Sequence, residues 1–272
     1  MLRIPPHDLP EPAAIRLREW QAEVDRHPEY VTRVSEAARL FHSRNQSHVP
    51  TFATVREVLA SMCPGAQRCM YCEDSAGDQV EHFHPKSLYP NYVFTWPNLL
   101  CACGGCNGPK NNAFAILTAE GPICVARKRN DDVLPPRSGP AALLDPRHED
   151  LMTFLEIDLS GTFQVQPRLG LSAVARARAE YTIETLRLNA REHLRKARRN
   201  TYSALEAMLM LYLHRKREAR CDDLPRIERE IRVAPHPAVW FEMRRQHAKI
   251  AALQPLFGQL PEALTWDWQP DV

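Results

Sequence analysis

The chain has 272 residues, of which 44% are hydrophobic and 25% are charged, so it is able to bury a sizeable core. Its formal net charge of +2 excludes a histone-like protein that binds nucleic acid through total charge alone. No apolar run approaches the roughly 18 residues of a membrane span, and the first residues lack the apolar segment of a secretory signal. We therefore expect a cytoplasmic protein of one or two compact units, with no membrane partner.

The first part of the chain, residues 1–62, is predicted to be a helical segment. Three stretches carry apolar residues at three- and four-residue intervals: residues 11–26, 29–44 and 51–62. The third stretch opens with Thr51 as a candidate N-cap and is followed by Pro64, which ends the pattern. Helices thus lead directly into a cysteine-rich part of the chain.

The next part, residues 63–115, is loop-rich and dense in Cys, His and Asn. It contains two Cys-x-x-Cys pairs separated by 30 residues, Cys69 with Cys72 and Cys103 with Cys106. Each pair presents two thiolates from one tight turn, and two pairs complete the tetrahedral four-sulfur shell of a closed structural zinc site. Cys101 competes with Cys103, but its spacing to Cys106 does not suit such a pair, so we predict that it is not a ligand. A closed site performs no Lewis-acid chemistry, so any catalysis must come from other residues.

Polar residues of the kinds that take part in catalysis lie between these cysteine pairs and just after them. The stretch "DQVEHFHP" is predicted to be a strand ending at a proline, and alternation along it would place the imidazoles of His82 and His84 on one face. Asn98 precedes the second pair. Asn107 directly follows the last cysteine, and Lys110 comes three residues later, where a helix is expected.

The remaining chain is expected to divide into a connector and a basic helical region. Residues 116–170 carry strand-like pieces and a "SG" turn that predict a small β element. Residues 171–272 are predicted to be helical, and the stretch 171–220 holds twelve Arg or Lys against five Glu. This excess is read either as a solvated helix face or as a surface for phosphates or an acidic partner.

The segment from Cys69 to Lys110 resembles the HNH endonuclease family, whose motif runs Cys-x-x-Cys, acidic-His, Asn-Leu and Cys-x-x-Cys-Asn, followed by Lys. The resemblance covers about a sixth of the chain. A wider pattern, carried by "CMYCE", "VEHFHPK", "WPNLL", "LLDPRHEDLMTFLEID" and "TIETLRLNAREHLRKAR", resembles PtuB, the HNH component of Septu and related retron anti-phage systems. The resemblance implies a mainly α protein with a small zinc-bound ββα-metal (HNH) nuclease core and helical flanks. It also implies hydrolysis of DNA or RNA, and a PtuA-like ATPase partner in a hetero-oligomer.

The resemblance also implies roles for individual residues. His82 would be the general base that activates water, because an imidazole is largely neutral near pH 7. Glu81 and Asn107 would give oxygen ligands to a catalytic Mg²⁺ or Mn²⁺ ion, which prefers hard donors. Two departures concern this ion: Asn107 stands where many relatives carry His, and Glu81 stands in place of the commoner Asp.

The other motif positions have less specific roles. Asn98 would brace the loop that carries the base. His84 is either a second metal ligand, an orienting residue or an ordinary strand-face histidine, and Lys110 is either a phosphate contact or a solvated helix lysine. An alternative function is a zinc-stabilised, non-catalytic module that binds nucleic acid or protein. A redox or zinc-storage protein would explain the cysteines but not the spacing of His and Asn.

Overall fold

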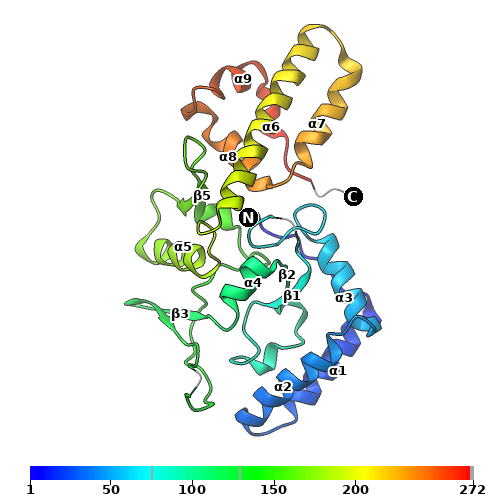
Figure 1. Cartoon of the computed structure of the whole chain (residues 1–272), viewed down its shortest axis with the longest axis vertical. Coiled ribbons are helices and arrows are strands. Elements are labelled where there is room, and N and C mark those ends of the chain that lie inside the picture. Colours follow the sequence, from blue (N-terminus) through cyan, green and yellow to red (C-terminus); the bar gives the residue numbers. More distant parts are fainter. Residues whose placement is uncertain (75, 129, 270–272) are drawn as a thin grey trace.

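The computed structural model describes residues 1–74, 76–128 and 130–269, and Figure 1 shows a mainly helical protein with small sheets. The helices are α1 (Glu11–Asp25), α2 (Tyr30–Arg44), α3 (Pro50–Ser61), α4 (Gly104–Lys110), α5 (Ala173–Thr185), α6 (Glu192–Arg217), α7 (Leu224–Arg232), α8 (Pro237–Gln246) and α9 (Gln254–Gln259). Three antiparallel pairs of strands lie among them: β1 (Gln79–His82) with β2 (Leu99–Ala102), β3 (Ala115–Thr118) with β4 (Gly121–Cys124), and β5 (Leu155–Ile157) with β6 (Val165–Pro167). Within the described ranges, no helix is both long and apolar enough to cross a membrane.

The N-terminal helices form where apolar residues recur at helical spacing. In α1 the buried residues Leu17, Trp20 and Val24 lie on one stripe, as an amphipathic helix requires. The expected third helix is present, but the prediction that Thr51 caps it is wrong. Pro50 occupies the first turn, and Val49 is the N-cap. Proline suits this position because its fixed φ fits the helix and its missing N–H would be unpaired there anyway.

An aromatic cluster fastens these helices to the segment between β1 and β2. The ring of Trp20 in α1 lies 5.9 Å from that of Phe52 in α3 and 5.5 Å from that of Phe94, which belongs to the β1–β2 connection. Phe41 of α2 lies 5.5 Å from Phe52. All four rings are buried. The N-terminal helices therefore pack against the β1–β2 connection and help to hold it in place.

The central unit consists of β1, β2 and α4, which follow one another in that order. Gln79 pairs with Ala102 and His82 with Leu99, and every residue of β2 is buried. The predicted strand is confirmed, but it ends at His82 rather than at the proline. In Figure 1 this unit lies between the N-terminal helices and the group formed by α6, α7, α8 and α9.

In the connector, the turn at Ser160 and Gly161 does connect a β-hairpin, as predicted. The C-terminal region confirms the predicted helices. Only some of its many Arg and Lys residues lie on a solvated helix face. Arg198 is buried and donates to the backbone oxygens of Phe163 and Leu188 at 3.2 and 3.4 Å. Arg178 forms a two-pronged ion pair with Glu149. Some of the positive charge therefore holds the fold together.

A buried histidine makes the stability of this region depend on pH. His236 precedes α8 and is 2% exposed. Burial, with the nearby Arg198 and Arg68 charges, lowers the pKa of His236 from its ordinary value of 6.5 to about 3. Between these values the unfolded chain binds a proton that the folded chain does not, so stability falls as the pH falls below about 6.5. We expect His236 to contribute a loss of about 1.4 kcal/mol in the free energy of unfolding for each pH unit.

Urea unfolding between pH 7 and pH 5 measures this slope. The variant His236→Gln should show a shallower dependence on pH than the wild type. His193→Gln, which changes an exposed histidine, should keep the wild-type slope. Equal slopes for the wild type and His236→Gln would contradict the assignment.

Candidate functional site

Four cysteines converge on one point. The Sγ atoms of Cys69, Cys72, Cys103 and Cys106 all lie within 4.8 Å of one another, and all four residues are buried. The Sγ atoms of Cys72 and Cys103 are 3.7 Å apart. Tetrahedral zinc with bonds of about 2.3 Å places its sulfur ligands about 3.8 Å apart, so this four-cysteine cluster fits a structural zinc ion. No other group of three or more His, Cys, Asp or Glu converges in this way within the described residues.

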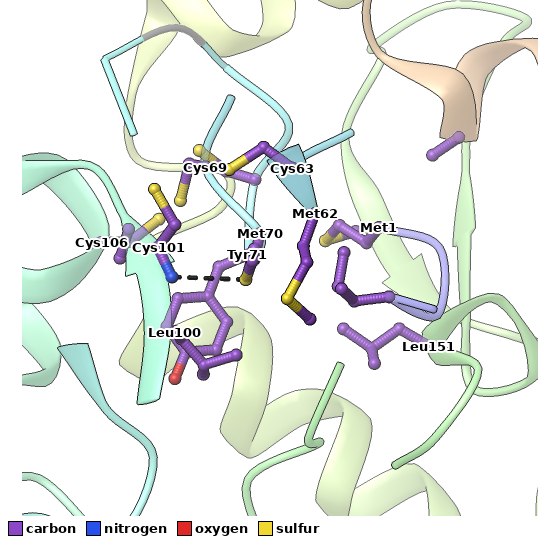
Figure 2. Packing of buried hydrophobic residues seen from close by; sticks show 14 of the residues in the cluster. Met1, Met62, Cys63, Cys69, Met70, Tyr71, Leu100, Cys101, Cys106 and Leu151 are labelled. Carbon is purple, nitrogen blue, oxygen red and sulfur yellow. Dashed lines mark hydrogen bonds between the residues drawn. The ribbon is translucent and has the colours of Figure 1, made fainter. Parts of the chain in front are cut away.

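Backbone hydrogen bonds shape the two turns that carry these thiols. The N–H of Glu73 donates to the oxygen of Cys69 at 2.8 Å, and the N–H of Cys106 donates to the oxygen of Cys103 at 3.0 Å. As predicted, Cys101 lies outside the cluster: its Sγ donates to the oxygen of Gly77 at 2.8 Å. Figure 2 shows Cys101 on β2, where its backbone N–H also contacts the sulfur of Met70.

An arginine from the distant C-terminal region contacts this cluster. Nη2 of Arg191 donates to the Sγ of Cys106 at 3.1 Å, and Nη1 lies 3.6 Å from the Sγ of Cys103. A Cβ atom on Gly105 would collide with Nη1, so the glycine leaves room for the guanidinium. Because thiolates around zinc carry excess negative charge, Arg191 is placed to stabilise the loaded site.

We expect Arg191→Gln to weaken zinc retention by about 10-fold or more, since partners that donate to metal ligands typically contribute that much. Zinc release to a coloured chelator measures the effect. Lys196→Gln is the matched control, because Lys196 is an exposed basic residue that pairs with Glu192 and lies in the same region. Equal release rates for Arg191→Gln and the wild type would show that the contact does not support the site.

Polar contacts join β1 to α4, and we call this set of four residues, Gln79, Glu81, Asn107 and Lys110, the polar seam. Gln79 and Glu81 alternate along β1, and Asn107 and Lys110 lie three residues apart on α4. Nδ2 of Asn107 donates to Oε1 of Gln79 at 2.9 Å. The ammonium of Lys110 pairs with the carboxylate of Glu81 and donates to the oxygen of His82 at 2.7 Å. The structure therefore places Lys110, 0% exposed, as the buried partner of Glu81 rather than at a surface where a phosphate would meet it.

The seam contains the donors predicted for a divalent ion, but a lysine competes for one of them. Burial raises the pKa of Glu81, and the Lys110 charge opposes that rise. The carboxylate of Glu81 and the amide of Asn107 are the hard oxygen ligands that Mg²⁺ or Mn²⁺ prefers. A divalent ion on Glu81 would share the carboxylate with Lys110 or displace it.

The predicted base, His82, is enclosed. Its Nε2 lies 2.9 Å from the oxygen of Val93, and its ring meets that of Phe41 edge-on at 4.4 Å. Burial lowers the pKa of His82 to about 3, so the ring is neutral. Since a carbonyl oxygen only accepts hydrogen bonds, Nε2 carries the hydrogen.

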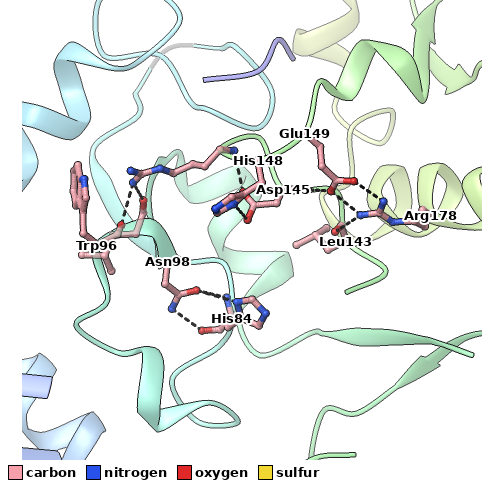
Figure 3. A network of polar contacts seen from close by, with 10 residues as sticks. His84, Trp96, Asn98, Leu143, Asp145, His148, Glu149 and Arg178 are labelled. Atoms are coloured by element: carbon pink, nitrogen blue, oxygen red, sulfur yellow. Dashed lines mark hydrogen bonds and ion pairs between the residues drawn. The ribbon is translucent and has the colours of Figure 1, made fainter. Parts of the chain in front are cut away.

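The expectation that His82 and His84 share one strand face is wrong. The strand ends at His82, whose ring contacts Phe41, whereas the ring of His84 contacts Tyr89 and Phe114. Asn98 instead holds the backbone around His84. Its Oδ1 accepts from the N–H of His84 at 2.7 Å, and its Nδ2 donates to the oxygens of His84 and Tyr92 at 3.1 and 2.9 Å (Figure 3). These contacts hold the backbone at His84 and Tyr92, and the role of Asn98 in bracing the loop of a catalytic base stays a prediction. Burial lowers the pKa of His84 below its ordinary value.

A turn in the stretch "LLDPRHEDLMTFLEID", for which the sequence predicts no site residue, brings Asp145 and His148 to the hollow that His84 lines. Nδ1 of His148 lies 2.8 Å from Oδ2 of Asp145 (Figure 3). Arg147 donates to the oxygens of Trp96 and Leu99 at 3.1 and 2.8 Å, which ties the turn to the segment around Asn98. No local pattern reveals this approach, since the two segments are about 50 residues apart in the chain.

Comparison with known proteins finds a relative for one part of the chain. No family model matches it. Over 82 residues the chain is 37% identical to "Septu protein PtuB" of Bacillus thuringiensis, a match that covers 28% of this chain and 32% of that protein. The match thus spans about a third of the relative's length, and the four-cysteine cluster is compatible with it. The chain is a partial homologue of a Septu protein.

Proposed function

We propose that this protein is a metal-dependent HNH-type endonuclease that hydrolyses the phosphodiesters of DNA or RNA. In this proposal it is the nuclease effector of a bacterial anti-phage defence complex with a PtuA-like ATPase. The four-cysteine cluster holds a structural zinc ion, and Glu81 with Asn107 hold a catalytic Mg²⁺ or Mn²⁺ ion. When bound, that ion would stabilise negative charge developing on the phosphate and on the leaving oxygen.

The order of β1, β2 and α4 around the four-cysteine cluster is the observation that carries the proposal. Glu81 is the next-to-last residue of β1, and Asn107 directly follows Cys106 on α4, a sequence of elements that supports Asn107 as the second oxygen donor. Asn98 braces the loop between the two strands. The partial likeness to a Septu protein supports a defence role.

One observation favours a second function, a zinc-stabilised module that binds nucleic acid or protein without cutting it. The carboxylate of Glu81 is already paired with Lys110, and the ring of His82 is enclosed. Catalysis through Glu81 requires the ion to compete with Lys110, and catalysis through His82 requires the ring to become accessible. A binding module requires neither change.

Cleavage of plasmid DNA and of RNA separates the two functions. The zinc-loaded protein is assayed with Mg²⁺ or Mn²⁺, alone and with the candidate ATPase. Asn107→Ala should lower the rate by about 100-fold or more, because it removes a ligand of the acting metal. Asn112→Ala, which changes an exposed asparagine just beyond α4, is the matched control and should cut like the wild type. Equal cutting by Asn107→Ala and Asn112→Ala would overturn the metal assignment, and binding without cutting would favour the second function.

The partner is tested separately. We expect the protein to co-purify with a PtuA-like ATPase when both are expressed together, and to cut faster in that complex. A protein that cuts at its full rate alone and binds no ATPase would contradict the proposed complex.

A further inference from the structure

A hollow lined by aromatic rings opens beside the loop that follows β1, and we call it the aromatic hollow. Its volume of about 390 Å³ lies within the range of about 300–1,000 Å³ that is typical of small-ligand sites. Its rings belong to Tyr30, His84, Tyr89 and Tyr92. The ring of His84 lies 5.1 Å from that of Tyr89 and 5.2 Å from that of Tyr92, and the two tyrosine rings are inclined by only 28°. Such a wall offers flat faces of the kind on which nucleobases stack.

Backbone contacts hold two of these rings in place before any ligand binds. Tyr92 ends a short 3₁₀ helix, and its backbone oxygen accepts from Nδ2 of Asn98 at 2.9 Å. Oδ1 of the same amide accepts the N–H of His84 at 2.7 Å (Figure 3). Tyr92 nevertheless remains 39% exposed, so part of its ring is open to a ligand.

The charge of the aromatic hollow suits a phosphate chain. Arg33 lines it, and Nε of this residue is buried with no hydrogen-bond partner among the described residues. The guanidinium of Arg127 lies 5.7 Å from the ring of Tyr30, and its Nη1 is likewise unpaired within the described ranges. Neither Asp nor Glu lines this hollow in the part of the chain that the structure describes. The lining of a hollow of about 550 Å³ beside α1, by contrast, includes Asp8 and Glu11, which would repel phosphate. Guanidinium groups with unused donors are well suited to phosphate oxygens.

The aromatic hollow lies close to the proposed catalytic ion without containing it. His84 lines the hollow and is three residues after Glu81, so their Cα atoms are at most about 11 Å apart. Stacked nucleotides rise about 3.4 Å each along one strand, so this distance corresponds to about three nucleotides. A strand whose scissile phosphate lies at the ion of Glu81 and Asn107 is therefore able to place a nearby base in the hollow. A base within a duplex would first have to leave its stack and its partner.

We propose that the aromatic hollow binds an unpaired base of the substrate strand a few nucleotides from the cut, so that single-stranded DNA or RNA is preferred to a duplex. The inference deepens the proposed nuclease function and rests on it for the cut itself. Tyr92 stacks on the base, and Arg33 binds a phosphate of the same strand. The chemistry remains with His82 and with the ion held by Glu81 and Asn107.

Fluorescence anisotropy of short labelled oligonucleotides tests the role of the ring. The protein is zinc-loaded, free of added Mg²⁺ or Mn²⁺, and in complex with the candidate ATPase if binding requires it. We expect Tyr92→Ala to weaken binding of a single strand by about 5-fold or more, the usual effect of losing the stacking of one base. Tyr92→Phe keeps the ring and should bind like the wild type. An abasic strand carries the same phosphates without bases, so Tyr92→Ala and the wild type should bind it equally.

The same assay tests the phosphate contact. Arg33→Gln should weaken binding of both the normal and the abasic strand. It should also reduce the slope of log K against log salt by about 0.7, the share of one phosphate in a single strand. Arg39→Gln is the matched control, because Arg39 is an exposed arginine of the same helix that pairs with Glu36, and it should bind like the wild type. An unchanged salt slope in Arg33→Gln would overturn the role of Arg33.

Zinc content and thermal unfolding establish that each variant is folded. A folded Tyr92→Ala that binds the single strand like the wild type, or that loses as much affinity for the abasic strand, would overturn the base site. Tighter binding of a duplex than of either a DNA or an RNA single strand would overturn it as well, whether or not the protein cuts. Cleavage is a separate measurement: a wild type that shows the expected binding but cuts neither DNA nor RNA with Mg²⁺ or Mn²⁺ would overturn the proposed nuclease and leave the base site standing.

Discussion

Replacing Cys106 by serine should remove zinc from the protein and lower its melting temperature by about 10 °C or more. Structural zinc contributes folding free energy on the order of 10 kcal/mol in small sites, and serine is a poor ligand for it. Cys106 is fully buried and lies in the first turn of α4, directly before Asn107. Loss of the ion should therefore loosen both the four-cysteine cluster and the polar seam. Zinc content per chain and differential scanning calorimetry measure the two effects.

Cys101→Ser is the matched control for this change. Cys101 is also a buried cysteine of the same segment, but its Sγ donates to a backbone oxygen, a bond that a serine hydroxyl is able to keep. It should retain a full equivalent of zinc and nearly wild-type stability. If Cys106→Ser kept its zinc, or if Cys101→Ser lost it, the ligand set would be wrong.

Replacing Lys110 by methionine should destabilise the protein by about 3–5 kcal/mol, the usual cost of leaving a buried charge without its partner. Lys110 is completely buried, and its ammonium pairs with the nearly buried carboxylate of Glu81. If Glu81 is a metal ligand, Mn²⁺ or Mg²⁺ should then take the position of the missing positive charge. We expect divalent ions to raise the stability of Lys110→Met more than that of the wild type, in proportion to the ion bound.

Urea unfolding with and without Mn²⁺ measures this recovery. The double variant Glu81→Gln with Lys110→Met removes both charges, so its stability should not respond to the ion. The same response in the double variant would place the ion elsewhere. No response in Lys110→Met would contradict the assignment of Glu81 as a ligand.

The four-cysteine cluster was predictable because zinc ligation imposes the Cys-x-x-Cys spacing, a local feature that does not depend on the fold of the rest of the chain. Two short turns each supply two thiols, and the structure brings both to one point. The N-terminal helices were predictable from periodicity for a similar reason. At Pro50 the sequence contains the decisive local feature, because proline is favoured in the first helical turn, and the prediction of Thr51 as the cap neglects it.

The parts that sequence did not predict depend on contacts between distant segments. Alternation along a strand predicted a shared face for His82 and His84, but the rule holds only while the strand continues, and β1 ends at His82. Arg191 reaches the thiols from 85 residues away. His148 borders the pocket of His84 because Arg147 ties its turn to the β2 segment. None of these approaches has a spacing that local patterns could reveal.

In the proposed nuclease, one metal ion supports the site while a different one acts in it. The most direct test follows cleavage by zinc-loaded protein, in complex with its ATPase if required, as Mg²⁺ is removed with a chelator and Mn²⁺ or Mg²⁺ is added back. Zinc content is measured in the same samples. The proposed function predicts that cutting stops and returns with the divalent ion while one zinc ion stays bound in the buried cluster throughout. Cutting that continues with zinc alone, or no cutting under any of these conditions, would contradict it.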